Sequence, residues 1–200
     1  MRKVLLAIVL AVLVAVPAAS AGNGNGNGKG DGAVKPLPAD QALPLIDAPA
    51  VVGQSSAIPV SAQDALAAMT APGAATTLSP GYASPAAAVA AATGCSGVSA
   101  HVSWGQWPYQ RVLYENIYWC AVYGDHVTSY STSVTTDQTL CTRQNVDHFT
   151  YSGGVGYSWV TIQANGTWTC PIIGVIPYSI GGWIRTAVND WGSAEIVGHS

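Results

Sequence analysis

Residues 94–200 alternate apolar and polar side chains in short runs, and this pattern constrains the fold more than any other feature of the chain. β-branched and aromatic residues dominate the runs, and Gly, Asn and Asp separate them. The candidate strands are residues 98–104, 112–123, 126–136, 148–152, 156–164, 167–172 and 182–188. No run after residue 94 has a convincing helical period. The pattern predicts an all-β domain, a small antiparallel β-sandwich or barrel.

Two dipeptides between candidate strands favour tight hairpins. Residues 165–166 (Asn-Gly) are typical of a type I′ turn, and residues 124–125 (Gly-Asp) place Gly where a type II′ turn needs it. The second turn would place Trp119 opposite Tyr130. We expect the core-facing side of this hairpin to carry Ile117, Trp119, Ala121, Thr128, Tyr130 and Val134.

The cysteines all lie in the β-rich region. They are Cys95, Cys120, Cys141 and Cys170. An even number of cysteines in an exported chain predicts two disulfides, and three pairings are open. Because no two of them form a C-x-x-C pair, a structural zinc site is disfavoured.

The N-terminus has the three parts of a secretory signal peptide. Arg2 and Lys3 precede an apolar run over residues 4–16, and Ala19 and Ala21 supply small residues for cleavage. We therefore expect residues 1–21 to be a signal peptide and the mature protein to be secreted and extracellular. The apolar run is shorter than a membrane span, and no later run is long enough, so we expect no span after cleavage.

Residues 22–93 are rich in Gly, Ala and Pro. We expect them to form a disordered spacer, either a stalk or a pro-segment, that precedes the β-rich domain of residues 94–200. Transient helices are expected over residues 61–69, with Ser61 as N-cap, and over residues 84–93, with Ser84 as N-cap.

Charge argues against two classes of partner. Residues 94–200 contain three arginines, no lysine and six acidic residues, a net charge of −3. A basic surface for nucleic acid or anionic lipid is therefore not expected.

Two Asp-His pairs stand out in a chain with four histidines: Asp125-His126 and Asp147-His148. If the two pairs converged, they could hold a metal ion for a hydrolase. Neighbours on a regular strand point to opposite faces, however, so adjacent Asp and His do not form a hydrogen-bonded dyad by themselves. We favour the interpretation that both pairs are structural corners of a sheet.

Catalytic signatures are missing. The sequence contains no G-x-S-x-G elbow, phosphate loop, dinucleotide fingerprint or H-E-x-x-H motif. We therefore expect no catalytic residue and no cofactor. Aromatic side chains remain as the candidate binding groups, because they stack on sugars and anchor interfaces. The candidates in turn-like settings are Trp107, Tyr109 and Trp191.

An aromatic-Trp-Cys segment leads to a glycine turn and a Val-Thr strand. Its residues are Tyr118, Trp119, Cys120, Gly124, Val127 and Thr128. Over residues 95–170 the chain resembles small secreted actinobacterial proteins with a disulfide-bearing β-domain and no known function. Residues 140–144 (LCTRQ) are similar to a segment of secreted subtilisin-inhibitor domains, which implies protease inhibition as an alternative.

Together these features predict a secreted, non-catalytic binding or structural module that acts at or outside the cell wall. Its expected partner is a cell-wall glycan or an extracellular protein. The alternatives are a secreted protease inhibitor with a protruding loop around Cys141 and a metal-dependent hydrolase.

Overall fold

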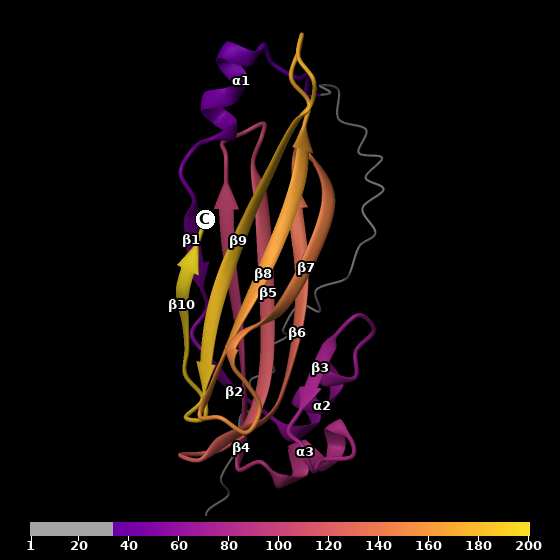
Figure 1. Cartoon of the computed structure of the whole chain (residues 1–200), viewed down its shortest axis with the longest axis vertical. Helices are drawn as coiled ribbons and strands as arrows, with labels where there is room; N and C mark the ends of the chain where they lie inside the picture. The colour runs from indigo at the N-terminus through magenta and orange to yellow at the C-terminus, as the bar shows by residue number, and fades with distance from the viewer. Residues whose placement is uncertain (1–33) are drawn as a thin grey trace, which may run out of the picture. The chain divides into compact units, whose positions relative to one another are not determined.

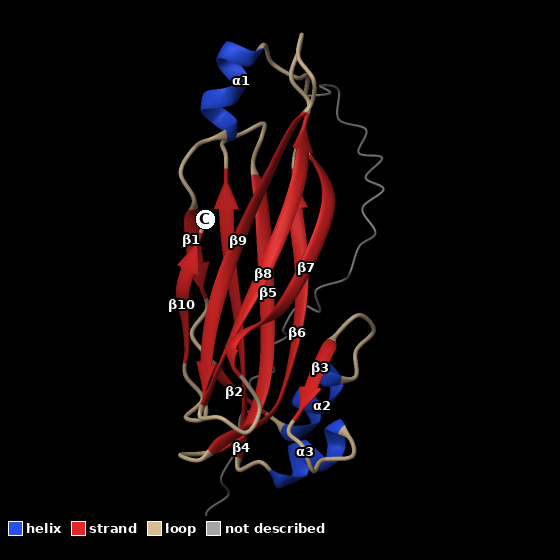
Figure 2. Cartoon of the chain, in the orientation of Figure 1, coloured by secondary structure: helices blue, strands red, loops and turns tan. Residues whose placement is uncertain are grey.

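Two antiparallel sheets pack face to face in the computed structural model, which describes residues 34–200 (Figures 1 and 2). The first sheet has the order β1-β4-β5-β6-β3, and β2 also pairs with β4. The second has the order β10-β9-β8-β7. The predicted fold class, a small antiparallel β-sandwich or barrel with two disulfides, is confirmed, and the structure has the form of a sandwich. The expected signal peptide (residues 1–21) and residues 22–33 lie outside the described residues.

The long strands form the sandwich, and the short elements lie around it. The long strands are β4 (Gly94–Trp104), β5 (Arg111–Val122), β6 (His126–Gln138), β7 (Thr142–Gly153), β8 (Trp159–Cys170) and β9 (Tyr178–Asn189). The short strands are β1 (Val51–Gln54), β2 (Ile58–Val60), β3 (Ala75–Leu78) and β10 (Ala194–His199), and the helices are α1 (Ala39–Ile46), α2 (Ala62–Met69) and α3 (Pro85–Ala91).

The β5–β6 hairpin follows the predicted pairing along most of its length. Trp119 lies opposite Tyr130, as expected. A β-bulge near the turn shifts the register by one residue, so that His126 pairs with Val122. The turn therefore spans residues 123–125, and Gly124 takes the positive φ of 75° that it requires. The predicted core-facing side is correct for Ile117, Trp119 and Tyr130, which lie in the core between the sheets. It is wrong near the turn, where the bulge pairs Ala121 with Val127 and brings Val127 into this core in place of Thr128.

The hairpin predicted at residues 165–166 is wrong, because these residues lie in the middle of β8. Gly166 faces the core under the indole of Trp168, where an added Cβ would overlap the ring. Gly182, its cross-strand partner on β9, makes the same room for Trp104. The two indoles pack with their centroids 5.5 Å apart. Gly166 therefore makes room for the Trp168 indole in the core and does not form a turn.

The disordered spacer predicted for residues 22–93 is wrong for residues 34–93, which fold onto the sandwich. Helices α2 and α3 pack over the Cys95–Cys120 disulfide on the outer side of the first sheet, and Ala65 and Met69 are buried there. The physical reason is that alanine-rich segments with too little apolar surface to fold alone can still bury it against a preformed sheet.

Both predicted helix starts are confirmed. The Ser61 hydroxyl accepts a hydrogen bond from the Asp64 amide, and the Ser84 hydroxyl accepts one from the Ala87 amide. At the other end of the sandwich, the carbonyl of Ile46 in α1 accepts a hydrogen bond of 3.0 Å from the buried Arg111 guanidinium.

The disulfides, left open by the sequence, are Cys95–Cys120 and Cys141–Cys170. The first links β4 to β5, and the second links the segment before β7 to the end of β8. Each therefore joins neighbouring strands of one sheet. The pair fits an oxidising compartment. No helix in residues 34–200 is long and apolar enough to cross a membrane.

A polar layer divides the core into two apolar clusters. Leu113 and Ile184 belong to one cluster, and Ile117 and Val188 belong to the other. Glu115 lies between them on β5, fully buried, and neither of its carboxyl oxygens has a hydrogen-bond partner within residues 34–200. Burial raises the pKa of Glu115 to about 8, and the nearby Thr186 hydroxyl opposes this shift although the pair falls short of hydrogen-bond geometry. Glu115 is therefore largely protonated at neutral pH.

Candidate binding face on the outer side of the second sheet

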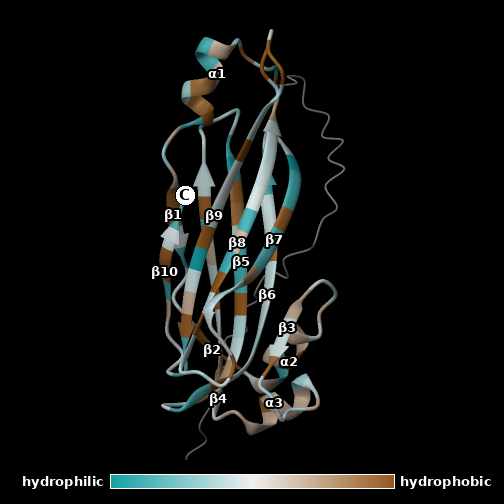
Figure 3. Ribbon diagram, viewed as in Figure 1, coloured by the Kyte–Doolittle hydropathy of each residue, from teal (hydrophilic) through white to brown (hydrophobic). Residues whose placement is uncertain are grey.

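The outer side of the second sheet carries a group of aromatic, amide and charged side chains that ranges from buried to exposed. Alternate residues of β7, β8 and β9 point away from the core there, and no described helix covers this side (Figures 1 and 3). We call this surface the aromatic-amide face. Its residues are Asp147, Phe149, Tyr151, Gln163, Asn165, Trp183 and Arg185.

A chain of hydrogen bonds crosses the aromatic-amide face from a cation to an anion. Arg185 Nε donates to Gln163 Oε1 at 2.5 Å. Gln163 Nε2 donates to Asn165 Oδ1 at 2.6 Å, and Asn165 Nδ2 donates to Asp147 Oδ1 at 2.5 Å. Each amide accepts one hydrogen bond through its oxygen and donates one through its nitrogen, so both amides are held in a single orientation. Gln163 is buried and holds its neighbours in place, whereas Asn165 is partly exposed and Asp147 is exposed, so the spare groups of these two residues are available to a ligand.

Aromatic rings flank the cation at the start of this chain. The Arg185 Cζ lies 3.5 Å from the centroid of the Tyr151 ring and 4.4 Å from the centroid of the Trp183 ring. Such contacts hold a guanidinium by its attraction to the π electrons. Tyr151 is still 50% exposed and Phe149 47% exposed. The face therefore offers a ligand both apolar ring surface and fixed polar groups.

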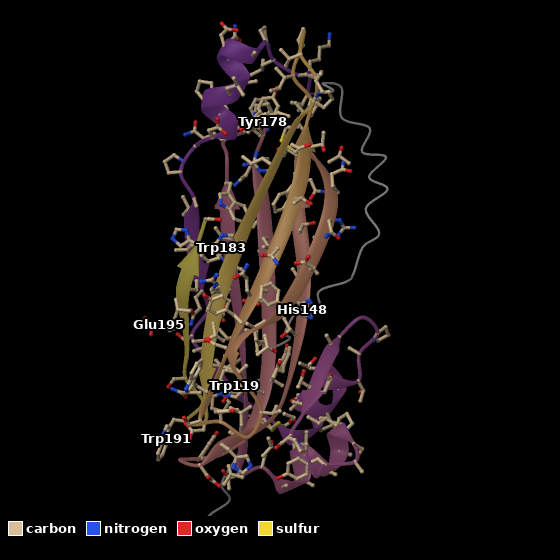
Figure 4. The ribbon with its side chains drawn as sticks, viewed as in Figure 1. Trp119, His148, Tyr178, Trp183, Trp191 and Glu195 are labelled. Carbon is tan, nitrogen blue, oxygen red and sulfur yellow. A yellow bond between two sulfur atoms is a disulfide. The ribbon has the colours of Figure 1, made fainter. Side chains whose placement is uncertain are left out.

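A cavity of about 280 Å³ lies further along the same side of the sheet, toward the β9–β10 turn. It is lined by Trp159, Ala187, Val188, Asn189, Ser193, Ala194 and Glu195. Trp159 is opposite Asn189, and Ala187 is opposite Glu195. Figure 4 shows Trp183 on β9 and Glu195 on the neighbouring edge strand β10. This cavity extends the surface that a long ligand could contact.

The three aromatic residues predicted to bind are not brought together. Trp107 is 67% exposed in the β4–β5 loop, and Trp191 is 69% exposed in the β9–β10 turn. The Trp191 ring lies beside Gly124 in the β5–β6 turn, so the two tryptophans are at opposite ends of β5. The proposed role of Tyr109 is corrected: its side chain is fully buried, and its hydroxyl accepts a hydrogen bond from the Leu37 amide.

The two Asp-His pairs lie in different settings. Asp125 sits in the β5–β6 turn, and its Oδ2 is 3.0 Å from Nδ1 of His126. Adjacent residues do make contact here, contrary to expectation, because the turn frees Asp125 from the strand geometry. The corner predicted for Asp147 and His148 is wrong, because both residues lie inside β7, where their side chains point to opposite faces of the strand. Within residues 34–200, no three His, Cys, Asp or Glu side chains gather as ligands for a metal ion.

His148 faces the gap between the edges of the two sheets (Figure 4). A polar cavity of about 410 Å³ lies there, between Val134 of β6 and Arg143 of β7. Burial lowers the pKa of His148, and the carboxylate of Asp147 opposes this shift. The imidazole is therefore mostly neutral at pH 7.

The segment around Cys141 is tied to the body of the sandwich. The Thr139 amide donates to the Gln110 carbonyl, and the Leu140 amide donates to the Pro108 carbonyl. Cys141 itself is buried. This geometry differs from the protruding loop expected of a protease inhibitor, so it lends that alternative no support.

The aromatic-amide face was not among the predicted sites, although part of its pattern is present in the sequence. Asp147, Phe149 and Tyr151 alternate along β7, and Trp183 and Arg185 alternate along β9. Alternation places each set on one side of its strand. The cross-strand register that joins the two sets through β8 requires the structure.

Comparison with models of protein families, with curated proteins and with solved structures finds no match to this chain.

Proposed function

We propose that this chain is a secreted, non-catalytic glycan-binding module that acts at or outside the cell wall. The aromatic-amide face is its binding surface. The observation that carries the proposal is the hydrogen-bonded chain from Arg185 to Asp147 with exposed aromatic rings beside it.

The chemistry of the face suits a sugar chain better than a protein partner. A pyranose ring has apolar C–H faces, which pack on aromatic rings, and a rim of hydroxyls, which pair with amides and carboxylates. Gln163 holds Asn165 and Arg185 in fixed orientations, so little side-chain entropy is lost when these two residues bind. A protein interface of the usual size would favour an apolar centre, whereas the centre of this face is polar.

The open sheet surface also suits a polymer. Strands in a sheet are about 4.8 Å apart, so side chains on β7, β8 and β9 contact successive parts of a ligand that lies across them. The cavity beside Trp159 lies along the same surface and would hold a further sugar unit. Aromatic groups at both places favour an extended chain over a single monosaccharide.

Retention of the purified protein on insoluble peptidoglycan, cellulose and chitin, together with affinity electrophoresis in gels of soluble polysaccharides, tests the proposal. We expect retention on at least one glycan. The paired change Tyr151→Ala with Trp183→Ala should weaken it about tenfold or more.

The paired change Trp107→Ala with Trp191→Ala is the matched control, because it removes two exposed indoles outside the face. It should leave retention unchanged. Failure of the unmodified protein to bind any glycan would contradict the proposal, as would equal losses in the two paired variants.

A further inference from the structure

Arg185 is a cation without an anionic partner in the part of the chain that the structure describes. Its Nε is bonded to Gln163, but neither terminal nitrogen has a hydrogen-bond partner in residues 34–200. No carboxylate oxygen of those residues lies within 4.0 Å of the guanidinium. Asp147, the acid at the other end of the polar chain, is separated from Arg185 by both amides.

The guanidinium is nevertheless held in place. Tyr151 lies under it, Trp183 lies beside it, and the Gln163 bond fixes the direction of Nε. A long flexible side chain is therefore ordered at the centre of an open face, with both terminal N–H groups free. A planar guanidinium with two free N–H groups matches the two oxygens of a carboxylate.

We infer that the ligand of the aromatic-amide face is an acidic glycan and that Arg185 binds the carboxylate of a uronic acid unit. This inference rests on the proposed function. The two free terminal nitrogens of Arg185 would donate to the carboxylate oxygens, while the rings beside Arg185 contact the C–H faces of the sugar.

Within residues 34–200, Arg185 is the one arginine on the aromatic-amide face, so it alone could attract an anionic ligand there. Residues 94–200 carry three arginines and no lysine, so a diffuse basic surface cannot supply the attraction. Of the other two arginines, Arg111 is buried in the core, and Arg143 lies at the β7 edge beside the His148 cavity. Recognition of an acidic glycan at this face therefore depends on one side chain.

Matched pairs of polysaccharides test the inference. Each pair consists of polygalacturonate, alginate or hyaluronan and the carboxyl-reduced form of the same polymer, which keeps the backbone and loses the charge. Affinity electrophoresis and calorimetry would compare the full protein with Arg185→Lys, Arg185→Gln and, as a control away from the face, Arg143→Gln. Thermal unfolding would establish that each variant is folded.

We expect at least one acidic polymer to bind about tenfold or more tightly than its reduced form. Arg185→Gln should abolish that preference, and Arg185→Lys should weaken it although it keeps the charge, because an ammonium group cannot form the paired contact. Arg143→Gln should keep it.

The outcomes separate this inference from the proposed function. Equal binding of acidic and reduced polymers would overturn the acidic-ligand inference and leave glycan binding intact. An acidic preference that survives in Arg185→Lys and Arg185→Gln would overturn the role of Arg185. Binding to neutral glycans such as cellulose or chitin, without binding to any acidic polymer, would overturn the acidic-ligand inference. Binding to no glycan in any of these experiments would overturn both this inference and the proposed function.

Discussion

The Arg185 guanidinium lies over the Tyr151 ring, with its Cζ 3.5 Å from the ring centroid. The two residues come from β9 and β7, which are separated by β8 in the second sheet. Their contact therefore spans β8 and joins the two outer parts of the aromatic-amide face.

Removal of the ring should weaken this contact. We expect Tyr151→Ala to lower the free energy of unfolding by about 0.5–1 kcal/mol beyond the loss in Tyr157→Ala, which removes a similarly exposed ring elsewhere. Urea denaturation measures both values. Equal losses in the two variants would show that the ring does not stabilise Arg185.

Glu115 should make stability depend on pH. Its folded pKa of about 8 lies above its ordinary value of 4.5, so the folded state holds a proton that the unfolded state has lost between these values. The contribution of protonated Glu115 to the free energy of unfolding is therefore fully present below about pH 4.5. It is lost as the pH rises toward 8.

Glu115→Gln keeps the shape and removes the titration. We expect the variant to gain stability relative to the unmodified protein as the pH rises from about 5 to 8, as followed by urea denaturation at several pH values. The same substitution at the exposed Glu195 is the control for removal of one surface carboxyl. If the unfolding free energies of Glu115→Gln and the unmodified protein changed in parallel with pH, this would contradict the conclusion that the Glu115 carboxyl is buried and unpaired.

Gly166 should not tolerate a side chain, because its Cβ would overlap the Trp168 indole. We expect Gly166→Ala to cost about 1–3 kcal/mol of unfolding free energy. Gly181→Ala is the control on the neighbouring strand, where an added Cβ would lie 3.5 Å from Thr167 Cγ2 in ordinary contact. Thermal unfolding compares the two, and a Gly166→Ala variant as stable as Gly181→Ala would contradict the packing of Trp168.

The two disulfides should stabilise the fold to a similar degree. Their sequence separations, 25 and 29 residues, predict about 3–4 kcal/mol each from the restriction of the unfolded chain. Double Cys→Ala variants of each pair, compared by guanidinium denaturation, should lose similar amounts. A negligible loss for either pair would show that its bridge does not restrain the unfolded chain as expected.

Features of the fold that depend on local sequence could be predicted. The alternation around Trp119 predicts its strand and its core-facing side, and Ser61 and Ser84 predict two helix starts. These signals depend on neighbours within a few residues. The predicted turn at residues 124–125 is one residue too short, because the β-bulge depends on packing between strands.

Features that depend on tertiary contacts could not be predicted. Asn165-Gly166 has the chemistry of a turn, but the indole of Trp168 needs the glycine within a strand. Residues 34–93 are rich in small residues and proline, a composition that predicts a spacer. Their folding depends on tertiary contacts, because Ala65 and Met69 are buried against the Cys95–Cys120 disulfide. The aromatic-amide face could not be predicted because Tyr151 and Arg185 meet only across β8.

Titration of ¹⁵N-labelled protein with an oligosaccharide of the glycan that it retains most strongly tests the central claim most directly. The side-chain amide signals of Gln163 and Asn165 and the indole N–H signal of Trp183 report on the aromatic-amide face. The indole signals of Trp107 and Trp191 report on the two ends of β5. We predict that the first three signals shift on binding and the last two do not; shifts confined to Trp107 or Trp191 would contradict the account.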